Sequence, residues 1–466
     1  CKDVIQDILA MVQDFNILDT RLTFFVVTNF LLTVISTYCL IRLFQVRRYL
    51  FIKPSIILLS YTNIFFQWPA AVFSGYYEHW LPNPYTMMLL VHGYVLVGLA
   101  GSILTLGTEA EKIWNRTRLE IKSGNTNIYF PGIIIMTLIV VVVFVFYLSY
   151  VPMTSTGLYA ILFDPLSSGM AREESLKLLE NGGMKYAFSI MTSSVAPLLI
   201  SFIIKSFLDN RINTFISYVS AIFVILLTSI AVSLIGSRSG LFNIIVVSCF
   251  VILWKRGFTI HPVFLALLAF FVLSPVVIIS LLREGKSLVD LAGLYITYMG
   301  LILDRIFFIP FHVGCWFIHY AQENGPFGIG AFQKFASMFR VEPLDVPNII
   351  GLIYGPQYYN SPVIGSISAT SGYLFSLYGY IGIMSLPISL LGLCVIDITV
   401  YIYNKLELFA LIPCLASINL STLMFVQSDY TVVILTHGFA MILFLSLALS
   451  YLAKVGSFDS LWRSNA

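Results

Sequence analysis

Long apolar segments, repeated along almost the whole chain, constrain the fold more than any other feature of this sequence. A helix that crosses the hydrocarbon core of a membrane needs about 20 apolar residues, and about eleven segments approach or meet that length. Only 11% of the 466 residues are charged, whereas a soluble domain carries about 25% charged residues. The sequence therefore predicts an all-α, polytopic membrane protein. The expected spans cover residues 22–44, 55–76, 84–106, 130–151, 184–208, 214–236, 239–254, 260–282, 376–403, 408–426 and 431–453.

Clusters of Lys and Arg predict which side of the membrane each connection faces, because short cytoplasmic loops are enriched in these residues. Each cluster follows an odd-numbered span, so a single orientation places all of them in the cytoplasm. Two long loops, 152–183 and 283–372, then face outward. The net charge of +3 is explained by these clusters and does not indicate nucleic-acid binding. The clusters are Arg42 to Lys53, Lys112 to Lys122, Lys205 with Arg211, Lys255 with Arg256, Lys405, and Lys454 with Arg463.

Two segments do not fit a simple series of spans. Residues 1–21 mix Asp with apolar residues, which is typical of an amphipathic helix in the membrane interface; because the first residue is Cys, a start further upstream stays open. Residues 291–321 are apolar enough to cross the membrane, which would invert the sidedness of everything downstream. The preferred interpretation is a kinked or re-entrant helix buried on the outer side. The predicted regions are the interfacial helix 1–21, N-terminal spans 22–151, a first outer loop 152–183, central spans 184–282, a second outer loop with partly buried helices 283–372, and C-terminal spans with a cytoplasmic tail 373–466.

Arginines at or near the outer ends of apolar segments are the strongest candidates for ligand binding. The planar guanidinium matches phosphate oxygens in two-point contact. The turn from Gly236 to Gly240 adds hydroxyls and backbone N–H groups at a helix start, which suit an anion. The alternatives are a snorkelling side chain, a lipid-phosphate contact, an ion pair without a role, or a small-residue hairpin that permits close packing. The predicted phosphate-binding residues are Arg172, Arg238, Arg283 and Arg305.

Several side chains on the outer side could act as a base or polarise a hydroxyl. The candidates are Glu173, Asp304, His312 and His319, and the sequence does not choose among them. Alternatively, Asp304 and Arg305 fix the loop against the bundle, and the histidines are satisfied core residues. Tyrosines in the second outer loop could stack on sugar rings or form an interfacial aromatic belt. They are Tyr354, Tyr358, Tyr359 and Tyr373.

No metal or cofactor is expected from the sequence. Two histidines seven residues apart share a helical face, but no carboxylate pair completes a ligand set. The six cysteines have no metal-ligand spacing. The chain also lacks the phosphate-binding loop of nucleotide-driven transporters and the common zinc-protease and serine-hydrolase motifs.

The order and sidedness of these features resemble the O-antigen polymerase (Wzy) family of bacterial inner membranes. The resemblance covers most of the chain as an architecture. At residue level it rests on the helix around Arg172, the Gly236–Gly240 turn, the run from Arg305 to Pro310 and the run from Ser366 to Gly382. It implies a fold similar to GT-C glycosyltransferases and an active face in the periplasm.

The resemblance also implies a reaction in lipopolysaccharide biosynthesis. Members of the family join undecaprenyl-pyrophosphate-linked oligosaccharide units into a polymer, together with a Wzz-type co-polymerase and within membrane lipids. Arg172 and Arg305 would then stabilise the pyrophosphate leaving group without a metal ion. Two alternatives stay open. An O-antigen ligase uses the same donor with a different acceptor, and a polysaccharide flippase or other transporter predicts polar residues at mid-membrane and internal repeats.

Overall fold

The computed structural model is helical throughout the residues that it describes, with no strand among them. Four segments are long and apolar enough to cross a membrane, namely Val26–Leu43, Gly132–Tyr150, Gly183–Leu208 and Phe215–Ser233. Two shorter apolar helices are Pro84–Ala100 and Ser239–Trp254. The chain is therefore an α-helical membrane protein. The described residues are 20–46, 53–72, 84–104, 129–164, 167–179, 182–210, 212–236, 238–255, 308–331, 339–359, 411–423 and 438–445, with a few single positions between them.

Helices occupy the predicted spans wherever these fall on described residues. The helix predicted at 1–21 and the spans at 260–282 and 376–403 lie almost entirely outside them, so the number of spans stays a prediction. The observed elements are α2 (Thr20–Val46), α3 (Pro54–Thr62), η3 (Asn63–Gln67), α4 (Trp68–Val72), α6 (Pro84–Leu104), α8 (Tyr129–Tyr150), α11 (Gly182–Ile190), η6 (Met191–Val195), α12 (Ala196–Leu208), α13 (Phe215–Ser233), α14 (Arg238–Lys255) and α22 (Leu411–Leu423).

Two of the spans contain a π-helical turn, and each turn ends two residues before a proline. The turn η3 precedes Pro69, and η6 precedes Pro197. Proline has no N–H to donate to the carbonyl four residues earlier, so the helix accommodates it by widening one turn. In the first case the wide turn leaves Asn63 and Gln67 buried inside an otherwise apolar helix.

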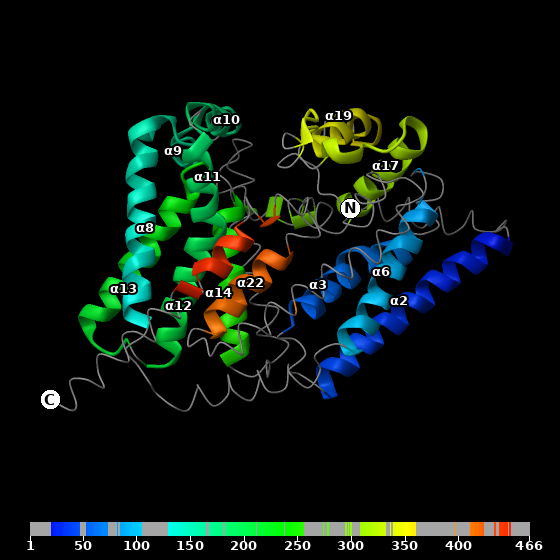
Figure 1. Cartoon of the computed structure of the whole chain (residues 1–466), viewed down its shortest axis with the longest axis horizontal. Coiled ribbons are helices and arrows are strands. Elements are labelled where there is room, and N and C mark those ends of the chain that lie inside the picture. Colours follow the sequence, from blue (N-terminus) through cyan, green and yellow to red (C-terminus); the bar gives the residue numbers. More distant parts are fainter. Residues whose placement is uncertain are drawn as a thin grey trace.

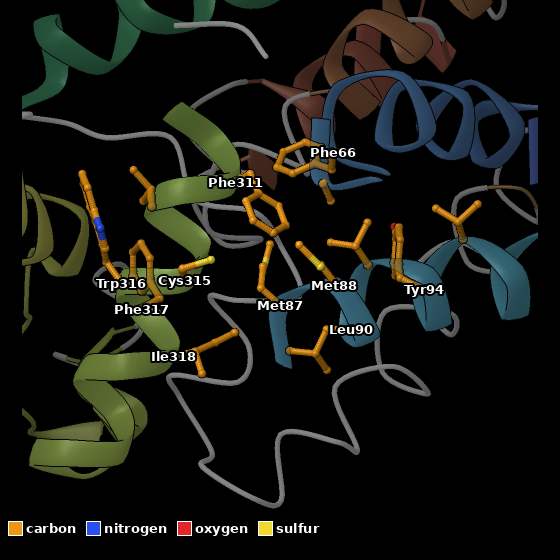
Figure 2. Close-up of a cluster of buried hydrophobic side chains, with 14 of the residues drawn as sticks. Phe66, Met87, Met88, Leu90, Tyr94, Phe311, Cys315, Trp316, Phe317 and Ile318 are labelled. Carbon is orange, nitrogen blue, oxygen red and sulfur yellow. The ribbon is translucent and has the colours of Figure 1, made fainter. Parts of the chain in front are cut away.

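The described helices pack around three apolar cores, and the two largest cores belong to two groups of helices (Figure 1). The first core joins α2, α3 and α6 to α17 (Ile309–Asn324) and α19 (Val346–Tyr359). Figure 2 shows Phe311 and Cys315 of α17 close to Met87 of α6. The second core joins α8, α12 and α13. The third, smaller core joins α14 to α22. Helix α22 contacts α3, α12 and α14, and it lies between the two groups in Figure 1.

Helices from both predicted outer loops lie at the same end of the molecule, the top in Figure 1. Residues 152–183 contain η4 (Met153–Ser155), α9 (Gly157–Phe163) and α10 (Ser168–Leu178). Residues 283–372 contain α17, η8 (Gly328–Ala331) and α19. Residues 310–318 of α17 are buried around the whole helix, so this segment packs inside protein. Whether 291–321 crosses the membrane stays a prediction, because most of 291–307 lies outside the described residues.

A buried ion pair ties α3 to the C-terminal part of the chain. Nζ of Lys53 lies 3.3 Å from Oδ2 of Asp397, and both residues are 4% exposed. Ser55 donates to the same carboxylate through its hydroxyl, at 2.6 Å, and its backbone N–H, at 3.2 Å. A carboxylate at the first turn of a helix is favourable. The pair, here called the Lys53–Asp397 clasp, links two segments 342 residues apart through the contact of Asp397 with Ser55.

Candidate functional site

The first outer loop is seated on the turn between α13 and α14. The backbone N–H of Leu158 donates to the carbonyl of Leu234 at 3.0 Å. A Cβ added to Gly157 would lie 2.1 Å from the carbonyl oxygen of Ile235, so only glycine fits there. Gly236 has a φ of +74°, a conformation that glycine adopts without strain. The predicted Gly236–Gly240 turn is therefore a docking point for α9.

Helix α10 presents Arg172 at the surface. Thr156 caps α9, because its Oγ1 accepts from the N–H of Tyr159 at 3.1 Å. In α10 the hydroxyl of Ser175 donates to the carbonyl of Arg172 at 2.9 Å, and Ser175 is fully buried. Arg172 is exposed. This geometry leaves the guanidinium available to an anion at the end of the molecule where α9 meets the Gly236–Gly240 turn.

The other predicted phosphate ligands are only partly described. Arg238 is the first residue of α14, two positions after Gly236, so its backbone lies beside the docking point of α9. Glu173 lies on α10 next to Arg172. The side chains of Arg238 and Glu173 lie outside the described part of the structure, as do Arg283, Asp304, Arg305 and Tyr373 altogether.

His312 lies in the apolar core of the first helix group. It is 3% exposed, and its ring packs 6.5 Å from that of Phe308. Burial lowers the pKa of His312 to about 3, so the imidazole is neutral at physiological pH. A catalytic base has to reach the proton that it removes. The placement is that of a core histidine, the alternative left open by the sequence.

His319, two turns nearer the end of α17, is better placed for acid–base chemistry. Its Nε2 lies 3.2 Å from Oε1 of Glu323, and the two side chains are 28% and 57% exposed. A carboxylate beside one ring nitrogen orients the imidazole and fixes which nitrogen faces outward. The sequence named His319 but missed its partner Glu323. The spacing of four residues on a helix is the signal that could have identified the pair.

Tyr354 forms a contact between α17 and α19. It is 6% exposed, and its ring stacks on Trp316 at a centroid distance of 6.1 Å. The ring of His319 lies 5.8 Å from the Tyr354 ring. Tyr354 thus packs within the protein and holds His319 in place, instead of offering an open surface to a sugar. Tyr358 and Tyr359 lie in the last turn of α19, and their side chains are outside the described part.

A chain of hydrogen bonds inside the first helix group was not predicted. Nδ2 of Asn63 donates to Oε1 of Gln67 at 2.7 Å, and Nε2 of Gln67 lies 2.7 Å from Nδ1 of His92. Oγ1 of Thr37 lies 3.0 Å from Oδ1 of Asn63 and 3.0 Å from Nε1 of Trp68. Nε2 of His92 has no hydrogen-bond partner among the described residues. Polar groups inside a membrane are costly and frequently functional.

Within the described residues, no group of three or more His, Cys, Asp or Glu side chains is arranged to hold a metal ion. Comparisons with known protein families, with curated proteins and with solved structures found no match to this chain. The geometry of the described residues therefore carries the functional interpretation.

Proposed function

We propose that the chain is a membrane glycosyltransferase of the O-antigen polymerase type. It would join polyprenyl-pyrophosphate-linked oligosaccharide units at the outer, periplasmic face of the bacterial inner membrane. The observation that supports this proposal is that three features lie toward the same end of the molecule, with α10 at the upper left of Figure 1 and α17 at the upper right. The three features are the exposed Arg172 on α10, the Gly236–Gly240 turn under α9, and the His319–Glu323 pair on α17.

The chemistry that these groups support is displacement of a pyrophosphate. An acceptor hydroxyl loses its proton to His319, and its oxygen forms a bond to the anomeric carbon of the donor sugar. The bond from that carbon to the phosphate oxygen breaks, and the electron pair leaves with the pyrophosphate. Arg172, with Arg238 at the start of α14, stabilises the charge that develops on the leaving group. Glu323 orients the imidazole of His319 through the contact with its Nε2.

Reconstitution tests the reaction itself. The purified protein in liposomes is given polyprenyl-pyrophosphate-linked repeat units with EDTA present, and the products are separated by length on a gel. A ladder of polymer lengths is expected, with free polyprenyl pyrophosphate as the second product. Absence of a ladder, both with EDTA and with added divalent metal, would rule out the polymerase. A lipid A core acceptor in a parallel reaction distinguishes the polymerase from a ligase.

The role of Arg172 is tested by comparing two substitutions on α10, one at Arg172 and one at a control position. Arg172→Ala is expected to lower the rate of polymer formation about 10²-fold or more, because one donor to the developing charge is lost. Lys177→Ala removes another exposed cation of α10 and should leave the rate near that of the wild type. Equal rates for Arg172→Ala and Lys177→Ala would contradict the pyrophosphate role.

The role of His319 is tested by the dependence of rate on pH. His319→Gln is expected to slow polymer formation about 10²–10⁴-fold, and to abolish the fall in rate at low pH that protonation of the base causes. Gln322→Ala, three residues further along α17, is the control and should keep the wild-type profile. A slow His319→Gln variant with an unchanged pH profile would show that His319 only supports the fold.

A transporter is the second candidate, because the buried chain through Asn63, Gln67 and His92 supplies polar groups inside the helix bundle. A transporter would move labelled lipid-linked units across the bilayer without forming a ladder. Gln67→Leu would then abolish the movement. In the polymerase, Gln67→Leu would lower stability and leave the chemistry of the outer end unchanged in correctly folded protein.

A further inference from the structure

Helices α9 and α10, here called the elbow, expose large apolar side chains. Leu162, Phe163 and Met170 are 63%, 70% and 71% exposed. Phe163 packs its ring only against Tyr159 among the described ring contacts, at 4.6 Å between centroids. Side chains of this size are costly to leave in water. Clusters of them on a surface mark a partner or a membrane.

The position of the elbow relative to the membrane follows from the ends of the two spans that it adjoins, α8 and α13. Helix α8 has 22 residues, which corresponds to about 33 Å, close to the thickness of the hydrocarbon core. It ends at Tyr150, and η4 follows after two residues. Helix α13 ends at Ser233, and the next residue, Leu234, accepts the hydrogen bond from Leu158 of α9. The elbow therefore starts where two spans reach the membrane surface.

The exposed apolar surface continues from α8 toward the elbow. Val142, Phe146 and Tyr150 recur at four-residue spacing on α8 and are 51%, 55% and 46% exposed, so they form a lipid-facing stripe. Met153 in η4, 46% exposed, prolongs the stripe. Both α9 and α10 contact η4. The apolar side chains of the elbow thus adjoin a surface that already faces lipid.

The geometry points to insertion of the elbow into the outer leaflet, with Leu162, Phe163 and Met170 among the acyl chains. The occupant of this surface is phospholipid, not a second protein. The elbow carries two cations, Arg172 and Lys177, against the carboxylates of Asp164, Glu173 and Glu174. Apolar burial and not net charge therefore drives the contact, which makes it independent of anionic lipid. The elbow would insert in the same way in a polymerase or in a transporter.

The test measures the depth of a fluorescent probe. The six native cysteines are replaced by Ala, and an environment-sensitive dye is attached to Phe163→Cys in the full chain in phosphatidylcholine vesicles. Phe146→Cys, on the lipid-facing stripe of α8, is the membrane reference. Gln322→Cys, exposed in the polar end of α17, is the aqueous reference. Quenching by nitroxide-labelled lipid is compared with quenching by iodide in solution.

The probe at Phe163 is expected to lose more emission to the nitroxide lipid than to iodide, with the blue-shifted spectrum of the Phe146 probe. Adding phosphatidylglycerol to the vesicles should not change the quenching. Quenching by iodide at the level of the Gln322 probe, with none by the lipid, would overturn the insertion. If Phe163→Cys does not yield monodisperse protein, Met170→Cys takes its place with the same expectations.

Discussion

The Lys53–Asp397 clasp provides a sharp energetic test of the fold. Replacing Asp397 with Leu leaves the ammonium of Lys53 buried without its carboxylate partner, and it removes the acceptor of the Ser55 N–H and hydroxyl. Breaking a buried ion pair from one side costs about 3–5 kcal/mol. Because Asp397→Leu removes an acceptor that the Lys53 ammonium and both Ser55 donors share, its cost is expected at the upper end of that range.

Lys53→Met is expected to cost less, at the lower end of about 3–5 kcal/mol. The carboxylate of Asp397 keeps both hydrogen bonds from Ser55, at 2.6 and 3.2 Å. The double variant Lys53→Met with Asp397→Leu removes both charges together. Replacing a buried pair by apolar side chains of similar volume is often nearly neutral, so the double variant should be more stable than either single variant.

The free energy of unfolding is measured by reversible denaturation in mixed micelles, followed by circular dichroism. Lys177→Met is the matched control, because Lys177 is exposed and surface substitutions stay within about 0.5 kcal/mol. Additive losses in the double variant would refute the reasoning, since independent sites add. So would a Lys53→Met variant as stable as the Lys177→Met control.

Two further predictions concern the seat of the elbow and the core histidine. Gly157→Val is expected to destabilise the protein by about 1–3 kcal/mol and to release α9 to proteases, because its Cβ would meet the Ile235 carbonyl at 2.1 Å. Gly300→Ala, with nothing within 4 Å of its Cβ, is the control. The pKa of His312, lowered to about 3, lies below its unfolded value of about 6.5. Stability should therefore be complete above pH 6.5 and fall as the pH drops toward 3, and thermal unfolding of His312→Phe should lack this slope, in contrast to His319→Phe.

Within the described residues, helices lie where the sequence predicted spans, because span length and apolar character are set by the bilayer. It could not predict which side chains of an apolar helix meet protein and which meet lipid. Helix α17 illustrates this limit. His312 and His319 share one helical face, yet His312 is buried in the core and His319 is 28% exposed beside Glu323. Contacts with α6 and α19, distant in sequence, decide the difference.

The use of Lys and Arg clusters to predict topology was similarly incomplete for Lys53 and Lys205. Both were interpreted as topology signals of short inner loops. The structure shows Lys53 in the clasp and Lys205 paired with Asp209, with both lysines almost fully buried. A statistical rule for Lys and Arg in loops does not include the tertiary partner, since Asp397 is far away in the chain. The π-helical turns η3 and η6 were not predicted either. Pro69 and Pro197, which follow them, were the signal in the sequence, but the continuous apolar pattern there predicted a regular helix.

The two helix groups give the clasp a consequence for the proposed reaction. Arg172 and the Gly236–Gly240 turn rest on the group built from α8, α12 and α13, whereas His319 and Glu323 rest on the group built from α2, α3 and α6. Phosphate binding and acid–base chemistry would therefore come from different bodies. Helix α22 and the clasp are the described contacts that tie α3 toward the C-terminal part of the chain. Catalytic groups act only when held within a fraction of an ångström of their productive positions. A substitution that breaks the Lys53–Asp397 clasp should thus slow the reaction even in protein that remains folded, although the clasp is far from both sets of catalytic side chains.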